Sequence, residues 1–182
     1  MILNKLYLKG SFTISLDKIE DERGFFARYY CTDELKNSGI IFEVLQINNS
    51  FNKYKGTIRG LHFQKPPKAE KKIVRCINGA IWDVIVDLRK GSKTFGKWYG
   101  TELSSENRLM MYVPEGFAHG FQTLSDNTEI IYLHSEFYSK KHEDALLYND
   151  EKLLIDWPIR IENISKKDKK NKRLIQIEPL IV

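Results

Sequence analysis

Ile81-Trp82-Asp83-Val84-Ile85-Val86-Asp87-Leu88 is a run of eight residues rich in β-branched side chains. Successive side chains of a β-strand point to opposite faces of its sheet. In this run Trp82, Val84, Val86 and Leu88 would share one face, and Asp83, Ile85 and Asp87 the other. The alternation predicts a strand that carries two carboxylates on the same face as Ile85.

Similar short segments recur along the chain, separated by turn residues such as Asn78-Gly79 and Pro114-Glu115-Gly116. This spacing is typical of a β-sandwich or barrel. We expect further strands at residues 12–16, 26–31, 44–50, 56–64, 72–77, 97–103, 108–113, 120–123 and 129–134. Residues 32–39 are expected to form one short capped helix, and the lysine-rich segment near the C-terminus is a candidate for a second. The prediction is an all-β fold with few short helices.

Composition places the chain among globular proteins. Its 182 residues, 42% hydrophobic and 29% charged, suit one domain with a substantial core, and no repeat or linker divides them. No apolar run is long enough to span a membrane, and the first ten residues lack the features of a signal peptide. Cys31 and Cys76 are too few for a disulfide framework, and their spacing fits no zinc site. We therefore expect a reduced, cytoplasmic protein that does not associate with membranes.

The net charge of +5 is concentrated near the C-terminus, where residues 166–173 hold six lysines and arginines. Such a block is usually a solvated, partly mobile segment. Nucleic-acid binding would also need interleaved aromatic residues or a recognition helix, and neither is evident there. We expect no nucleic-acid partner, although a basic surface can steer a small anionic substrate toward the protein.

The segment Gly56–Gln64, with the sequence GTIRGLHFQ, places an arginine and a histidine inside a predicted strand. Histidine suits proton transfer near neutral pH, and arginine suits bidentate binding of phosphate. The pair suggests an enzyme that holds a phosphorylated substrate and moves a proton on it. A single strand histidine is, however, more often a hydrogen-bonded core residue.

Other ionisable side chains occupy strand positions, among them Lys72, Asp83 and Tyr132, and Tyr132 shares its face with Ile130 and His134. Burying such groups is costly unless they pair or take part in a site. A buried polar network and a functional site both remain open for each residue alone, but several together favour a site.

An ordered set of motifs resembles the dTDP-4-dehydrorhamnose 3,5-epimerases, cupin-type jelly rolls that invert nucleotide-linked 4-keto sugars. The resemblance covers residues 21 to about 168, and a basic tail occupies residues 159–182. Its blocks are Asp21–Phe26, Gln46–Ser50, Gly56–Gln64, Asp83–Arg89, Ser92–Gly96, Val113–Phe121, Tyr132, Tyr148–Asp150, Trp157-Pro158 and Ser165–Asp168.

The resemblance implies a single cupin-type jelly-roll domain over residues 1–182, with isomerase activity that needs no metal and no cofactor. It also implies a nucleotide-sugar substrate, a homodimer in which partner strands complete the site, and a role in making lipopolysaccharide or capsule sugars.

The resemblance also implies catalytic roles. His62 matches the base that removes a proton alpha to the C-4 ketone, and Asp168 matches the carboxylate that orients this base. Lys72 matches the lysine that stabilises the enolate oxygen, the electrostatic task that usually dominates such sites. Tyr132 matches the acid on the opposite face of the sugar, and Asp83 matches a further buried acidic residue.

Binding roles carry over in the same way. Arg23, Arg59 and Lys72 match contacts to the nucleotide sugar. The other matched contacts are the polar Gln46, Asn48 and His119, the acidic Glu143, and the aromatic Phe26 and Tyr138, of which Tyr138 corresponds to the ring that stacks on thymine.

The chain departs from the family pattern along its nucleotide-facing edge. Arg28 stands where the family has a glutamate that touches the nucleotide, and Glu70-Lys71 replaces the usual Gln-Gly before the active-site lysine. Tyr148 replaces a tryptophan and Glu151 a proline. Both dTDP-linked and GDP-linked 4-keto sugars, hexose or heptose, therefore remain candidate substrates.

Other functions remain to be weighed. A metal-dependent cupin oxygenase needs a His-x-His pair, and Leu61-His62-Phe63 supplies only one histidine. A non-catalytic sugar-nucleotide-binding cupin would leave His62, Lys72, Tyr132 and Asp168 unexplained. Epimerisation at C-3 and C-5, epimerisation at one carbon only, and ketoisomerisation differ in fine geometry that the sequence leaves open.

Overall fold

The predicted strand at residues 81–88 forms β8 (Ala80–Asp87) in the computed structural model, which describes residues 1–182. Its two faces are both buried, and they contact different cores. Ile85 belongs to an inner core, whereas Val84 and Val86 belong to an outer one. The predicted alternation is confirmed, and it places β8 between two packed layers.

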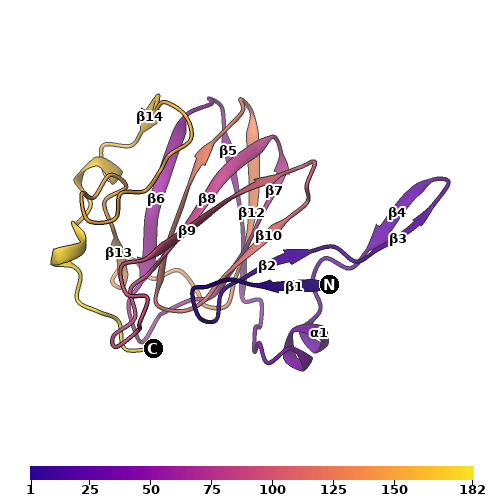
Figure 1. Ribbon diagram of the computed structural model, residues 1–182, viewed down its shortest axis with the longest axis horizontal. Helices are drawn as coiled ribbons and strands as arrows, with labels where there is room; N and C mark the ends of the chain where they lie inside the picture. Colours follow the sequence, from indigo (N-terminus) through magenta and orange to yellow (C-terminus); the bar gives the residue numbers. More distant parts are fainter.

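Two sheets face each other and form a sandwich (Figure 1). The first sheet has the strand order β1 (Ile2–Lys5), β2 (Phe12–Ser15), β10 (Met110–Val113), β7 (Lys72–Asn78), β12 (Thr128–His134) and β5 (Gln46–Asn52). The second has the order β13 (Glu143–Ala145), β6 (Thr57–Gln64), β11 (Phe117–Thr123), β8 and β9 (Trp98–Ser104), and β14 (Asn163–Ile164) runs parallel to β6. The predicted all-β, cupin-type fold is confirmed.

The inner core lies between the sheets, where Val74, Ile85 and Phe121 are buried. Each sheet is also covered on its outer face. Helix α1 (Thr32–Asn37) supplies Leu35 to the core outside the first sheet. The C-terminal segment, with the 3₁₀ turns η1 (Asp168–Lys170) and η2 (Leu174–Gln176), covers the second sheet and buries Leu180 there.

The six lysines and arginines of residues 166–173 are exposed, as predicted, but the segment differs from a free tail because it packs against the second sheet. Its backbone is tied to the second sheet, because Lys172 accepts a hydrogen bond from the Leu147 amide. The Lys172 ammonium pairs with Asp144 at 2.6 Å. The apolar residues that follow the lysines account for the difference, since Leu174, Ile177 and Leu180 pack on the outer core. The helix considered for this region is limited to the single turn of η1.

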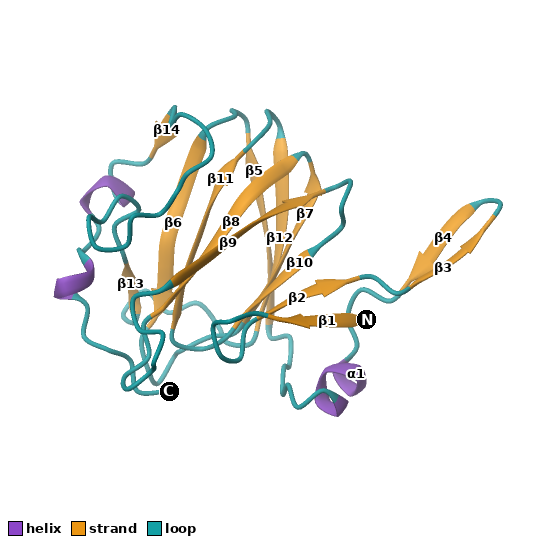
Figure 2. Ribbon diagram, viewed as in Figure 1, coloured by secondary structure: helices purple, strands orange, loops and turns teal.

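The strand expected at residues 26–31 is wrong in extent, because β4 spans Gly24–Ala27 and pairs with β3 (Lys18–Asp21). This hairpin projects away from the sandwich (Figures 1 and 2). The short strands β1, β3, β13 and β14 were not expected, and β5 and β10 each begin two residues later than predicted. None of the helices is both long and apolar enough to cross a membrane.

Candidate active site

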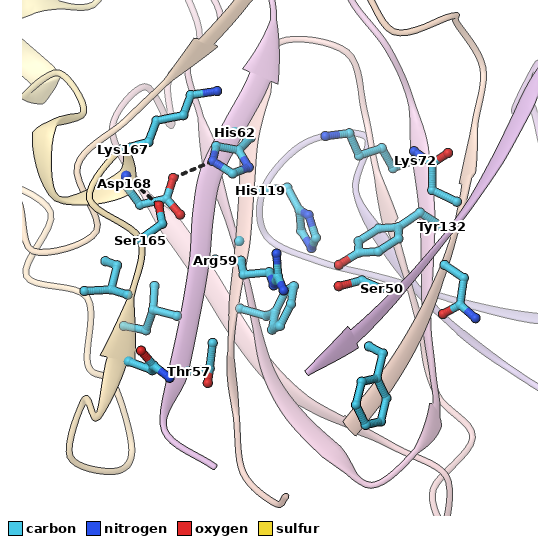
Figure 3. A pocket seen from close by; sticks show the side chains of 18 of the residues that line it. Ser50, Thr57, Arg59, His62, Lys72, His119, Tyr132, Ser165, Lys167 and Asp168 are labelled. Carbon is cyan, nitrogen blue, oxygen red and sulfur yellow. Dashed lines mark hydrogen bonds and ion pairs between the residues drawn. The ribbon is translucent and has the colours of Figure 1, made fainter. Parts of the chain in front are cut away.

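A pocket of 1020 Å³ opens between the two sheets and is lined by polar side chains from both (Figure 3). Its volume lies at the upper end of the range for small-molecule pockets. Strand β6 contributes Arg59 and His62, and β11 contributes His119. The opposite sheet contributes Asn48 and Ser50 from β5, Lys72 from β7, and Tyr132 and His134 from β12, while Ser165, Lys167 and Asp168 come from the C-terminal segment.

His62 and Asp168, 106 residues apart in sequence, form a hydrogen-bonded pair at one wall of this pocket. The distance from His62 Nε2 to Asp168 Oδ1 is 2.7 Å. Strand β14 places Asp168 there, because Asn163 and Ile164 pair with the first residues of β6. Burial raises the pKa of the Asp168 carboxyl, but the hydrogen bond and charge of His62 outweigh burial and hold the pKa below its usual range. Asp168 is therefore an ionised partner for the imidazole.

Arg59 and His62 both face the pocket although they are three residues apart, a spacing that places side chains on opposite faces of a regular strand. The register between β6 and β11 shifts between His119 and Phe121, and this irregularity changes the phase of the alternation. Gly60 has a φ of +126°, and a Cβ there would lie 2.6 Å from the Cα of Gly120. The close approach of two glycines therefore allows both functional side chains to enter the pocket.

Tyr132 lies across the pocket from His62, on the other sheet (Figure 3). Burial, followed by the charge of Asp83, raises the pKa of its phenol. The phenol is therefore protonated near neutral pH and can donate a proton. Lys72 lies on the same side as Tyr132, and its Nζ is 3.0 Å from Glu70 Oε1.

Asp83 lies beneath the pocket and binds His119 rather than lining the cavity itself. The distance from His119 Nε2 to Asp83 Oδ1 is 2.7 Å, and both side chains are buried. The second carboxylate oxygen of Asp83 has no hydrogen-bond partner. His119 in turn meets the Tyr132 ring edge-on, with the centroids 6.1 Å apart. Asp83 thus acts on the pocket through its neighbours.

Three other residues with expected binding roles lie at the rim. The phenol of Tyr138 donates to Glu143 at 3.0 Å, and Glu143 also pairs with Lys167, which lines the pocket. Gln46 accepts a hydrogen bond from the Tyr138 amide at 3.2 Å. Gln46, Tyr138 and Glu143 therefore form a continuous edge next to His62 and Asp168.

Arg23, Phe26 and Arg28 are not brought to the pocket of their own chain. Arg23 and Phe26 lie on the projecting β3–β4 hairpin, where Arg23 pairs with Asp21 and Phe26 is 69% exposed. Arg28 pairs with Glu34 of α1 at 2.6 Å. The hairpin projects away from the sandwich, and none of the three residues lines the pocket that contains His62.

The family model described as dTDP-4-dehydrorhamnose 3,5-epimerase matches residues 5–176. A dTDP-4-dehydrorhamnose 3,5-epimerase from Shigella flexneri is 43% identical over 162 residues, which cover 88% of this chain and 89% of that protein. The chain belongs to the dTDP-4-dehydrorhamnose 3,5-epimerase family.

Solved structures agree with this assignment. The Bacillus anthracis epimerase, crystallised with TDP and pyrophosphate, has a TM-score of 0.91 at 41% identity, covering 94% of this chain and 98% of that one. ChmJ, a 3'-monoepimerase from Streptomyces bikiniensis in complex with dTDP-quinovose, has a TM-score of 0.87 at 29% identity, covering 94% and 87%. The similarity therefore extends to epimerases described as acting on one carbon.

Within this epimerase fold, the structure adds pocket residues that had no expected role. His134 and Lys167 line the pocket, and Glu70 lies behind Lys72. His134 could have been predicted from the sequence, because the two-residue period of the strand places it on the same face as Tyr132. No three His, Cys, Asp or Glu side chains come together in a group that could hold a metal ion.

Proposed function

We propose that this chain is an epimerase that inverts C-3, C-5 or both carbons of a nucleotide-linked 4-keto sugar through an enolate. One observation carries the proposal: the His62–Asp168 pair faces Tyr132 across the pocket, with Lys72 on the side of Tyr132. Inversion needs a base and an acid on opposite faces of one carbon. The family to which the chain belongs supports the same reaction.

The proposed reaction assigns one proton step to each side of the pocket. His62 binds Asp168 through Nε2, which leaves Nδ1 to take the proton alpha to the C-4 ketone. The electron pair moves onto the ketone oxygen, and the Lys72 ammonium stabilises the resulting enolate. The electron pair then returns to the carbon as Tyr132 gives that carbon a proton on its opposite face. Solvent restores the phenol, and His62 releases its proton to solvent.

The nucleotide would extend between Arg59 and the rim. Arg59 points into the cavity and suits a diphosphate, because guanidinium binds phosphate oxygens bidentately. The exposed ring of Tyr138 is suited to stacking on a base. We favour a dTDP-linked 6-deoxyhexose, because the structural relatives bind TDP or a dTDP-sugar.

A GDP-linked 4-keto sugar, hexose or heptose, is the second candidate. It was suggested by Arg28, which replaces an acceptor that touches the nucleotide in the family. In the structure Arg28 pairs with Glu34 and does not line the pocket of its own chain, so we propose that any effect on the nucleotide site requires a second chain.

A homodimer would place the hairpin residues in a site. Strand β5 is an edge strand beside the pocket, and Ile47 and Phe51 on it are exposed. Edge strands and exposed apolar side chains are typical of surfaces that pair with another chain. We propose that the β3–β4 hairpin of a second copy covers this edge and supplies Arg23 and Phe26.

Two inactive variants can test the shared site. Mixing His62→Asn with Arg23→Ala and allowing subunits to exchange should restore about a quarter of wild-type activity, because half of the chains form heterodimers and each has one intact site. Activity that stays absent after exchange, with heterodimers shown by mass spectrometry, would contradict a site built from both chains.

The reaction itself can be tested by deuterium incorporation. The protein is incubated in deuterium oxide with dTDP-linked and GDP-linked 4-keto-6-deoxy sugars, and mass spectrometry counts the deuterons in each product. Two deuterons indicate exchange at C-3 and C-5, and one indicates a single carbon. His62→Asn should abolish incorporation at both carbons while nucleotide binding persists, and exchange at the wild-type rate would show that the base is another residue.

We also propose a cytoplasmic location and a role in making surface-polysaccharide sugars. The free cysteines Cys31 and Cys76 are compatible with a reducing compartment. Lipopolysaccharide or capsule synthesis fits an epimerase of this family, and detection of the product sugar in surface polysaccharide, lost when the gene is deleted, would support the role.

A further inference from the structure

An unbroken chain of hydrogen bonds runs from the rim of the pocket to the Lys72 ammonium, through residues that the proposed reaction does not use. Its contacts are Tyr138 N to Gln46 Oε1 at 3.2 Å, Gln46 Nε2 to Asn48 Oδ1 at 3.0 Å, Asn48 Nδ2 to His134 Nε2 at 3.3 Å, His134 Nδ1 to Glu70 Oε2 at 2.8 Å, and Glu70 Oε1 to Lys72 Nζ at 3.0 Å.

The direction of this hydrogen-bond chain follows from its first donor. A backbone N–H can only donate, so the Tyr138 amide requires the carbonyl oxygen of Gln46. The Gln46 amide nitrogen then donates to the Asn48 oxygen, which leaves the Asn48 amide nitrogen to face His134. Because that nitrogen also donates, His134 Nε2 must accept.

This direction assigns the proton of the His134 ring. With Nε2 accepting, a neutral imidazole carries its hydrogen on Nδ1, where it donates to the Glu70 carboxylate. Glu70 accepts on its other oxygen from Lys72. Each contact along the hydrogen-bond chain therefore joins one donor to one acceptor, and none joins two donors or two acceptors.

Glu70 supplies the negative charge that the buried Lys72 ammonium requires. The Lys72 side chain is only 10% exposed, and the Glu70 side chain beside it is 9% exposed. A buried ammonium is costly without a counter-charge. Burial acts against ionisation of Glu70, but the charge of Lys72 and the hydrogen bond from His134 outweigh it and hold the Glu70 pKa below its usual range. The ion pair also fixes the direction of the lysine, and the ring of His134 fixes Glu70.

We propose that His134 and Glu70 are positioning residues that hold the Lys72 ammonium in place and couple it to the nucleotide-side amides of Gln46 and Asn48. The inference rests on the proposed function, in which Lys72 stabilises the enolate oxygen. It adds that contacts made at the rim of the pocket by the nucleotide influence the position of the lysine. Neither His134 nor Glu70 exchanges a proton with the sugar.

The first experiment measures the tautomer and needs no turnover. The protein, labelled with ¹⁵N-histidine, contains four histidines, and loss of one signal in His134→Phe assigns the His134 ring. At neutral pH the ¹⁵N shifts should place the hydrogen on Nδ1 and leave Nε2 as an acceptor. A ring with its hydrogen on Nε2, or one that averages between tautomers, would overturn the hydrogen-bond chain.

The second experiment separates kcat from KM. His134→Phe should lower kcat about 10- to 100-fold, the effect expected for losing a hydrogen bond to a charged group, with KM nearly unchanged. His134→Asn retains a donor near the Nδ1 position and should recover most of kcat. Equal kcat values for wild type and His134→Phe, or no recovery in His134→Asn, would overturn the positioning role.

A double variant tests the coupling to the rim. Gln46→Leu should lower kcat and raise KM in the wild-type background, but should change only KM in His134→Phe, since the link to Lys72 is already broken. The same kcat effect in both backgrounds would show that no coupling passes through His134. If wild type turns over no 4-keto sugar, the proposed function fails, whereas the tautomer measurement still decides the hydrogen-bond chain.

Discussion

Replacing Asp168 with asparagine tests the paired arrangement on which the proposed proton abstraction depends. Asp168 Oδ1 lies 2.7 Å from His62 Nε2, and its carboxylate is held ionised by that contact. Asparagine keeps the size and removes the charge. The imidazole becomes positive as it takes the proton, so the loss falls on the transition state. A hydrogen bond to a charged group contributes about 1.5–3 kcal/mol, which corresponds to a roughly 10- to 150-fold decrease in kcat.

The assay is the rate of deuterium incorporation at each carbon under saturating substrate. Asp144→Asn is the matched control, because Asp144 is likewise a paired carboxylate, with Lys172 as its partner, but lies outside the pocket. We expect Asp168→Asn to slow incorporation at both carbons and Asp144→Asn to leave it unchanged. An Asp168→Asn rate within about threefold of wild type, where the barrier changes by less than 1 kcal/mol, would refute the role assigned to the carboxylate.

The same variant has a stability signature that depends on pH. The pKa of Asp168 is lower in the folded protein than the ordinary value of about 3.9. The stabilisation from Asp168 is therefore fully present above that ordinary value and is lost as the pH falls through the lower, folded value. Urea denaturation should show a larger deficit for Asp168→Asn at pH 7 than at pH 3, and an equal deficit at both would contradict this linkage.

Three further predictions follow from the pocket. Tyr132→Phe should lower the rate of inversion by ~10²–10⁴-fold, while His62 still exchanges the substrate proton with solvent. Mass spectrometry measures the exchange and NMR of the product measures the inversion. Inversion at the normal rate would exclude Tyr132 as the acid. Gly60→Ala should destabilise the protein by about 2–5 kcal/mol, measured by urea denaturation, because its Cβ meets Gly120; a fully stable variant would show that the close approach is dispensable. Activity should survive a chelator, and loss that a divalent metal restores would overturn metal independence.

The strands of the sandwich follow from local pattern, and β8 shows why. Both of its faces are buried, and the alternation of Val84, Ile85 and Val86 specifies which core each side chain enters. The irregular part of β6 does not follow in this way. A strict two-residue period separates Arg59 from His62, and the register shift that reunites them arises from contact with β11. In the sequence of β6 itself, the only sign of this irregularity is Gly60.

The local sequence pattern also could not predict which residues distant in the chain meet at the pocket. Asp168 could be assigned to His62 through the family resemblance, but the basic residues around it suggested an exposed tail. Its position depends on the two residues of β14 and on apolar side chains further along, which tie the segment to the second sheet. Arg23 and Phe26 differ from Asp168: the resemblance also assigned them to the site, but they do not reach the pocket of their own chain.

The two-sheet architecture explains why this fold suits inversion at carbon. Strand β6 belongs to the second sheet and carries His62, whereas β12 and β7 belong to the first sheet and carry Tyr132 and Lys72. In the proposed reaction, a sugar held between the sheets would meet His62 on one face and Tyr132 on the other. Lys72 lies on the side of Tyr132, so the proposed reaction requires the ketone oxygen to point toward the first sheet. Under this proposal, the carbons that invert would depend on how the sugar ring turns about the held ketone, and the rim residues proposed to bind the nucleotide would limit that movement.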